Sequence, residues 1–225
     1  MMEYPIRINK YLRDKGLASR READKLVEAG LVFVNGKRAE SGQLANANDK
    51  IIVKGKQKKL VYLAYCKPRG LATQDLKGRP SVISEWKKQG LYPIGRLDKE
   101  SEGLLILTND GRFAREILSR PVGGYPAKYE KEYVVSVKEP LKSGITKIFA
   151  SGMDTTAFGK LLPVKSKILT DTKISMILNE GKRHQIRVMM NELGYTIVSL
   201  RRVRIGSIKL ENLQPGETRA ISIKI

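Results

Sequence analysis

Apolar side chains in the first thirty residues recur at helical spacing. The first such group predicts a short helix that ends near Gly16, and its members are Ile8, Tyr11 and Leu12. A second helix is expected from Ser19, because Ser19 can accept from first-turn amides while Glu22 reaches back as a capping box. Its predicted buried stripe consists of Ala23, Leu26 and Val27, and Gly30 ends it.

The spacing then changes to that of short strands. Residues 31–34 and 37–39 flank Asn35-Gly36, which is typical of a tight hairpin turn, and residues 49–54 form another predicted strand. The following Gly55-Lys56-Gln57-Lys58-Lys59 has no apolar side chain and is interpreted as a linker. We therefore expect a small domain over residues 1–58 and a larger one over residues 59–225.

The remaining chain is rich in strand patterns and has fewer helices. Strands are predicted over residues 60–66, 103–108, 133–137 and 174–178. Two helical stripes are also predicted, one made of Phe113, Ala114, Ile117 and Leu118, and the other, after the last of these strands, of Ile186, Met189, Met190 and Leu193. This segregated pattern predicts an α+β fold rather than an alternating parallel α/β fold.

The charge balance narrows the class of partner. The 225 residues contain 43 Lys or Arg and 23 Asp or Glu, for a formal charge of +20. Such a charge suits a nucleic acid, an anionic membrane surface or an acidic protein, or it simply solvates a surface in a basic proteome. The 41% of hydrophobic residues argues against disorder. No apolar run approaches the ~18 residues of a membrane span, and the N-terminus lacks a signal-peptide core.

A loop carboxylate is the main candidate for chemistry. Asp98 precedes the apolar strand 103–108 and lies close in sequence to the cations Arg96 and Lys99. In a partly closed cleft these neighbours would keep the carboxylate ionised, as a nucleophile or a base requires. The alternative is a turn-capping Asp, which is common in loops.

Clustered cations form the second candidate. Lys182, Arg183 and Arg187 surround the start of a predicted helix, where acidic residues are normally preferred, so a distant or external anion is expected to compensate. Strict alternation over residues 202–205 predicts that Arg202 and Arg204 share one strand face. Solvated surface charge is the alternative for both groups.

Other chemistries fit poorly. One Cys and one His leave almost no zinc site and exclude an internal disulfide, the acids are dispersed, and no phosphate-binding glycine loop or nucleophile elbow is present. His184 is interpreted as structural or as an RNA contact, and Cys66 as a small buried hydrophobe.

Two stretches carry resemblances to known families. From Arg7 to about Val53 the chain resembles the alpha-L RNA-binding domain of the ribosomal S-four type, through S-R-R-E-A and V-N-G-K at the family's spacing. The resemblance implies RNA contacts, made mainly to phosphates, at Arg7, Lys10, Arg20, Arg21 and Lys37.

Residues 61–225 resemble the RsuA family of pseudouridine synthases. The motifs G-R-L-D-K-E-S-E-G-L-L-I-L-T-N-D-G, K-E-Y, E-G-K-R-H-Q-I-R and R-V-R-I-G follow in the family's order. The resemblance implies a mixed, largely antiparallel sheet with a central cleft, and isomerisation of uridine to pseudouridine in ribosomal RNA. The sequence departs from the family at Cys66, where Asn is usual, and matches weakly over residues 121–130.

The resemblance also implies roles for individual residues. Asp98 would be the catalytic carboxylate, Tyr133 would stack on the uracil and assist proton removal, and Arg187 would pair with Asp98. Arg96 would enter the RNA where the target base leaves the stack. The pocket would be lined by Leu97 and Ile186, and further RNA contacts are expected at Lys182, Arg183, Arg202 and Arg204.

The family uses no metal and no organic cofactor, so none is expected here. We expect a cytoplasmic monomer whose partner is ribosomal RNA, with no membrane association. The main rival is a catalytically idle RNA-binding or ribosome-assembly factor on the same scaffold. A glycosidase or nuclease is the second rival, disfavoured by the charge of +20 and the single motif Asp.

Overall fold

A computed structural model describes residues 3–55, 59–75, 78–118 and 129–223. The chain divides into two compact units: the N-terminal unit, residues 1–60 with 110–113, and the C-terminal unit, residues 61–109 with 114–225. The predicted boundary at 58/59 adjoins residues 56–58, which lie outside the described residues, as do residues 121–128 of the weakly matching stretch.

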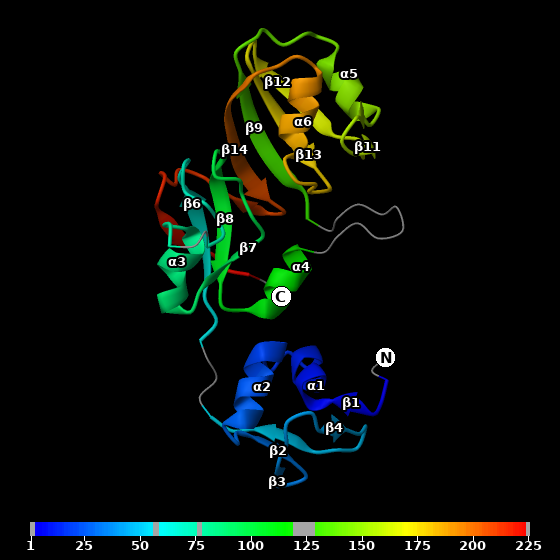
Figure 1. Cartoon of the computed structure of the whole chain (residues 1–225), viewed down its shortest axis with the longest axis vertical. Coiled ribbons are helices and arrows are strands. Elements are labelled where there is room, and N and C mark those ends of the chain that lie inside the picture. The colour runs from blue at the N-terminus through cyan, green and yellow to red at the C-terminus, as the bar shows by residue number, and fades with distance from the viewer. Residues whose placement is uncertain (1–2, 56–58, 76–77, 119–128, 224–225) are drawn as a thin grey trace. The chain divides into compact units, whose positions relative to one another are not determined.

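The N-terminal unit consists of two short helices followed by short strands (Figure 1). Its elements are β1 (Ile6–Arg7), α1 (Ile8–Asp14), α2 (Arg20–Glu28), β2 (Val32–Val34), β3 (Lys37–Arg38), β4 (Leu44–Ala45) and β5 (Ile51–Val53). Strands β3, β2 and β5 form an antiparallel sheet in that order, and β1 pairs with β4.

The helices of this unit follow the sequence pattern. The predicted capping box is confirmed: the Glu22 amide donates to the Ser19 hydroxyl, and the Ser19 amide donates to the Glu22 carboxylate. Leu12 and Ala23, one from each helix, are fully buried together with Val32 of β2. The helical stripes therefore close a small core over the sheet.

One mixed sheet dominates the C-terminal unit. Its helices are α3 (Val82–Trp86), the 3-10 turn η1 (Lys87–Gln89), α4 (Gly111–Ile117), α5 (Ile145–Ala150) and α6 (Gln185–Glu192). Its strands are β6 (Tyr62–Lys67), β7 (Tyr92–Ile94), β8 (Glu102–Thr108), β9 (Lys131–Val137), β10 (Asp154–Thr155), β11 (Gly159–Lys160), β12 (Lys165–Thr170), β13 (Lys173–Leu178), β14 (Ile197–Ile205), β15 (Ile208–Lys209) and β16 (Thr218–Ala220).

Strand order places the centre of this sheet. Across the described residues the order is β12-β13-β9-β14-β8-β6-β16, with β7 added on β8 and β15 on β14. Only the β14–β8 pair is parallel among these pairings, so the predicted mixed, largely antiparallel sheet is confirmed. Helices α5 and α6 cover the β9–β13–β14 part, and α3 packs on β6 and β8 (Figure 1).

The parallel pairing of β8 with β14 requires a glycine. Gly103 has φ +101°, and a Cβ atom there would lie 2.3 Å from the carbonyl oxygen of Arg202. No other residue type allows the two backbones to approach so closely. This contact joins the two parts of the sheet directly beside the loop that carries Asp98.

A β-bulge in β14 overturns one prediction. Arg202 pairs with Tyr133 of β9, but Arg204 pairs with Glu132, and the register shifts between the two arginines. Because neighbouring residues of β9 point to opposite faces, Arg202 and Arg204 do as well. The alternation in the sequence predicted a shared face, and that prediction was wrong.

Candidate active site

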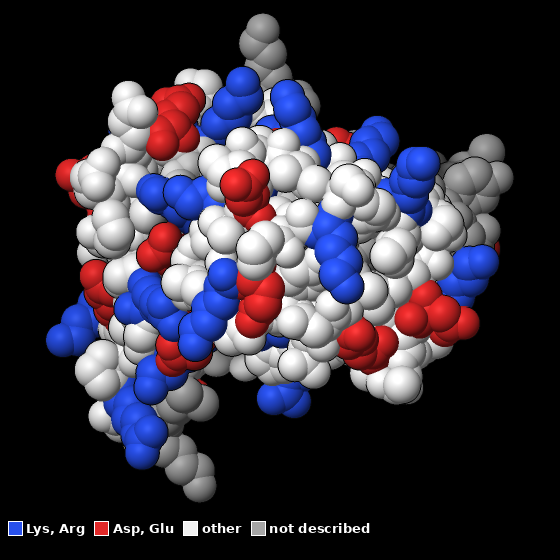
Figure 2. Space-filling model, turned by 90° about the horizontal axis from the view of Figure 1, so that it is seen from above, with Lys and Arg blue, Asp and Glu red and all other residues white. Residues whose placement is uncertain are grey.

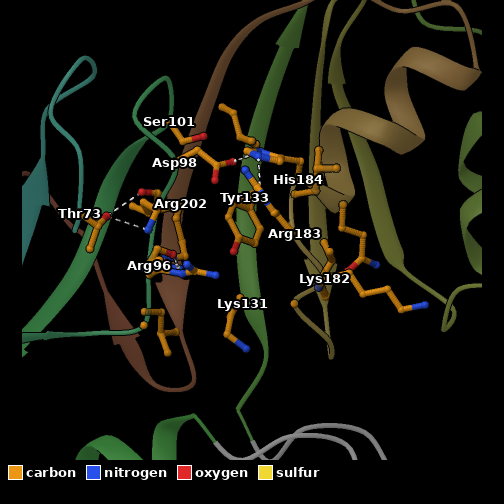
Figure 3. A pocket seen from close by; sticks show the side chains of 18 of the residues that line it. Thr73, Arg96, Asp98, Ser101, Lys131, Tyr133, Lys182, Arg183, His184 and Arg202 are labelled. Carbon is orange, nitrogen blue, oxygen red and sulfur yellow. Dashed lines mark hydrogen bonds and ion pairs between the residues drawn. The ribbon is translucent and has the colours of Figure 1, made fainter. Parts of the chain in front are cut away.

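A cleft of about 910 Å³ opens in the C-terminal unit. One wall is the loop between β7 and β8, which carries Arg96 and Asp98, and the other is the segment 180–184 that leads into α6. Tyr133 of β9 lies between them (Figure 3). The predicted pocket residues Leu97 and Ile186 are both buried and both line the cleft.

Asp98 meets two basic side chains, one from the opposite wall of the cleft and one from the first turn of α6. Its Oδ2 lies 3.0 Å from Nδ1 of His184 and 3.9 Å from Nε of Arg187. Figure 3 shows the Asp98 and His184 side chains pointing toward one another across the cleft. About a third of the Asp98 side chain stays exposed, so the carboxylate is accessible from the cleft.

Arg187 holds the Asp98 loop from behind rather than lining the cleft. Its Nη2 donates to the carbonyl of Glu100 and to the hydroxyl of Ser101, each at 3.1 Å. Arg187 is in the first turn of α6, which contains no acidic residue. The anion expected to compensate Arg187 is thus supplied by Asp98, which lies 89 residues earlier in the sequence.

His184 is the site residue whose place the sequence did not reveal. It caps α6 with φ +57°, a left-handed conformation that is uncommon outside glycine and is enriched at functional positions. The only histidine of the chain therefore contacts the motif aspartate. Only its position in the same motif as Arg187 could have pointed to it.

A buried pair shapes the segment 180–184. The Gln185 amide donates to Oε1 of Glu180 at 2.7 Å, and the same oxygen accepts from the backbone of Leu162 at 3.1 Å. Both side chains are buried. This pair fixes the segment at its two ends, so that Lys182, Arg183 and His184 are displayed toward the cleft.

The basic side chains that line the cleft differ in their exposure and in their interaction partners. Arg96 is exposed and donates to Gln74 at 3.2 Å, and Arg183 is exposed and donates to His184 at 3.1 Å. Lys182 points to Phe158, with its Nζ 5.3 Å from the ring centroid. Burial lowers the pKa of Lys131, which lies on the Tyr133 face of β9.

Arg202 and Arg204 are internal anchors. Arg202 is 3% exposed and donates through Nε to the Leu104 carbonyl at 2.7 Å. Arg204, on the other face of the sheet, pairs with Glu132 at 2.8 Å and Glu130 at 3.4 Å. Both guanidinium groups are thus engaged within the protein, although Arg202 lines the cleft and Arg204 is partly exposed, and RNA contact by either arginine stays a prediction.

The five cations predicted to bind RNA in the N-terminal unit have a different environment. Within the described residues none of them has an ion pair or a side-chain hydrogen bond, and all except the half-buried Lys10 are exposed; the five are Arg7, Lys10, Arg20, Arg21 and Lys37. Arg20 and Arg21 begin α2, beside the capping box. These positive charges are available for a partner.

The described residues offer neither a metal site nor a membrane-spanning helix. Within the described part of the chain, no group of three or more His, Cys, Asp or Glu side chains is arranged to hold a metal ion. No described helix is both long and apolar enough to traverse a bilayer. Cys66 is buried, as predicted, and burial raises the pKa of its thiol.

The fold and the site define an RNA-modifying enzyme with an appended RNA-binding domain, and comparisons with known proteins agree. Residues 61–192 match the RNA pseudouridylate synthase family, and residues 6–51 match the S4 domain. The chain belongs to the RNA pseudouridylate synthase family, whose members are isomerases, so the predicted family and enzyme class are confirmed.

Similar proteins cover nearly the whole chain. The ribosomal large subunit pseudouridine synthase B of Bacillus subtilis is 36% identical over 96% of this chain and 92% of its own length. A dual-specificity RNA pseudouridine synthase, RluF, from Salmonella typhi is 35% identical over 96% of this chain and 75% of its own. A crystal structure of a pseudouridylate synthase superposes with a TM-score of 0.69 at 26% identity, over 96% of each chain.

Proposed function

We propose that this enzyme converts a uridine of ribosomal RNA into pseudouridine in the cleft around Asp98. The observation that supports this most is a single accessible carboxylate held between His184 and Arg187, opposite a cleft-lining tyrosine. The bacterial relative that is 36% identical is named for the large ribosomal subunit. The reaction breaks the bond from N1 of uracil to the ribose and forms a bond from C5, so C5 loses a proton and N1 gains one.

In this proposal Asp98 starts the reaction. As an ionised carboxylate it attacks the substrate or removes a proton, so that the uracil is released and can turn. Arg187 contributes positive charge at 3.9 Å and fixes the loop through Glu100 and Ser101.

Tyr133 and Arg96 act on the target nucleotide. Tyr133 offers an aromatic face inside the cleft for stacking of uracil, and its hydroxyl assists proton removal from C5. Arg96 is exposed at the cleft and held by one hydrogen bond to Gln74. Its guanidinium can therefore fill the space in the RNA stack that the extruded base leaves.

The chain divides these tasks between two domains, residues 1–58 and 59–225. The first supplies positive charge to RNA phosphates through Arg7, Lys10, Arg20, Arg21 and Lys37, and the second carries the cleft with Arg183 and Lys182 at its wall. In this proposal the enzyme acts as a monomer. Ribosomal RNA as the proposed substrate is in keeping with a location in the cytoplasm.

A catalytically idle RNA-binding factor is the alternative, and one experiment separates the two. The purified protein is incubated with unmodified RNA of both ribosomal subunits, and pseudouridine is mapped by site. The parent protein is expected to modify a discrete uridine, whereas Asp98→Asn retains RNA binding and loses turnover. Glu100→Gln, which removes a carboxylate two residues away on the same loop, is the matched control and stays active. RNA binding by the parent protein without any pseudouridine would overturn the proposal.

A further inference from the structure

One buried hydroxyl makes two hydrogen bonds to the residue before Asp98. Thr73 Oγ1 donates to the carbonyl oxygen of Leu97 at 2.6 Å and accepts from the Leu97 amide at 3.0 Å. Thr73 is 4% exposed and Leu97 is 7% exposed, so water does not compete for these bonds. Figure 3 shows both interactions as dashed lines from Thr73 to the Asp98 loop.

The same segment also holds the loop on the other side of Asp98. The Gly70 amide donates to the carbonyl of Lys99 at 2.8 Å. Residues 70–73 therefore bracket Asp98 through its two neighbours, Leu97 and Lys99. Strand pairing does not reach these positions, because β7 ends at Ile94 and β8 begins at Glu102.

Residues 70–73, which bracket Asp98, are themselves fixed by a buried lysine of β6. The ammonium group of Lys67, which is 0% exposed, donates to the carbonyls of Pro68 at 2.8 Å and Leu71 at 2.6 Å. On the β14 side, Nη1 of Arg202 lies 3.4 Å from the Arg96 carbonyl. The backbone before Asp98 is thus tied to two separate parts of the sheet, with Thr73 making the closest contact.

We propose that Thr73 is a positioning residue for the reaction: its hydroxyl fixes the Leu97 peptide groups and thereby aims the Asp98 carboxylate into the cleft. This inference rests on the proposed function of Asp98. A reacting group must be held within about 0.5 Å of its productive place, and a 1 Å misplacement costs on the order of 10²-fold in rate. A threonine that only filled buried space would affect stability without a selective effect on turnover.

The test compares three variants with the parent protein. Thr73→Val keeps the shape of the side chain and removes both hydrogen bonds, while Thr73→Ser keeps the hydroxyl. Thr155→Val is the matched control, because Thr155 is 5% exposed and its hydroxyl likewise donates to one backbone carbonyl, of Gly159, and accepts from one amide, of Phe158. If Thr73→Val lowers the folded population, Thr73→Ala replaces it.

Three quantities are measured for each: the single-turnover rate with saturating enzyme, the RNA dissociation constant, and hydrogen exchange of the Leu97 amide. Thr73→Val is expected to lose on the order of 10²-fold in rate with unchanged RNA affinity, to expose the Leu97 amide to exchange, and to be rescued by Thr73→Ser. Thr155→Val is expected to keep the parent rate.

Equal rate losses in Thr73→Val and Thr155→Val would overturn the inference, since the loss would then be a general effect of destabilisation. A parent-like rate in Thr73→Val or Thr73→Ala, or an unchanged Leu97 exchange rate, would do so as well. A parent protein that makes no pseudouridine would remove the proposed function instead, and the exchange measurement would still report whether Thr73 holds Leu97.

Discussion

The two units use the same basic residue types in opposite ways. In the N-terminal unit, Arg20 and Arg21 are exposed and have no ion pair within the described residues. In the C-terminal unit, Arg202 donates to backbone carbonyls inside the sheet and Arg204 is paired with two glutamates. The number of basic residues therefore overstates the number of cations that a partner can contact, because some of them stabilise the fold.

Surface charge alone does not mark the site either. Figure 2 shows Lys and Arg spread over the visible face with Asp and Glu among them, not gathered in a patch of one sign. The cations that we propose to act on RNA or on Asp98 are distinguished by their surroundings: Arg20 and Arg21 are exposed at the start of α2, and Arg187 faces Asp98 from α6. Environment, rather than residue type, separates binding from anchoring.

The largest expected difference between the units is in stability. Arg202→Met leaves the Leu104 and Arg96 carbonyls without their donor, and loss of hydrogen bonds by buried groups costs about 1–3 kcal/mol each. Arg20→Met removes an exposed side chain and should stay within about 0.5 kcal/mol of the parent. Denaturant unfolding followed by circular dichroism measures both. Equal unfolding midpoints for the two variants would contradict the anchoring role of Arg202.

Next in size is the effect of the cleft aromatic. Tyr133→Ala removes the stacking face and should weaken binding of the extruded uridine by about 1–3 kcal/mol, while Tyr133→Phe keeps the face and loses only the hydroxyl. Single-turnover kinetics should rank the parent first, Phe second and Ala last. If the Tyr133→Phe and Tyr133→Ala variants turn over equally fast, Tyr133 is a core residue and does not stack on the uracil.

The free cations of the N-terminal unit should affect binding alone. Changing Arg20 and Arg21 together to Ala removes two phosphate contacts, which should flatten the plot of log affinity against log salt by ~1–2 units. The single-turnover rate at saturating enzyme should not change. A salt series for the parent and the double variant gives the slope, and Lys165→Ala, an exposed lysine paired with Glu130, is the control. An unaltered slope would show that these arginines do not face RNA.

The smallest effect concerns the cost of burying a cation. Burial lowers the pKa of Lys67 to about 8, below its ordinary 10.5, so the unfolded chain binds more protons above pH 8 and stability rises with pH through that window. Between pH 7.5 and 9 the gain should be on the order of 1 kcal/mol. Burial raises the pKa of Tyr65 to about 12, which lowers stability only above pH 10.

Denaturant unfolding at several pH values below 10 measures this gain. Lys67→Met should remove most of the rise with pH, even though it also loses the bonds to Pro68 and Leu71, and Lys131, whose pKa is also lowered by burial, should retain a smaller part. Lys10→Met in the N-terminal unit should leave the rise intact. A rise of unchanged size in Lys67→Met would assign it to another group.

The local elements of this protein could be read from the sequence because short-range rules dictate them. The capping box of Ser19 and Glu22, the turn at Asn35-Gly36 and the apolar run that becomes β8 depend on neighbours within a few residues. The ordered motifs of the second domain likewise identified the family and singled out Asp98. The catalytic roles of Asp98, Tyr133 and Arg187 stay predictions, which the experiments above address.

Tertiary structure alone decided how those elements meet. The bulge between Arg202 and Arg204 is a property of register against β9, so strict alternation in the sequence gave the wrong face. The contact of His184 with Asp98 spans 86 residues, and that of Thr73 with Leu97 spans 24. Such contacts follow from where strands and loops are brought together, and no local pattern of apolar and polar residues encodes them.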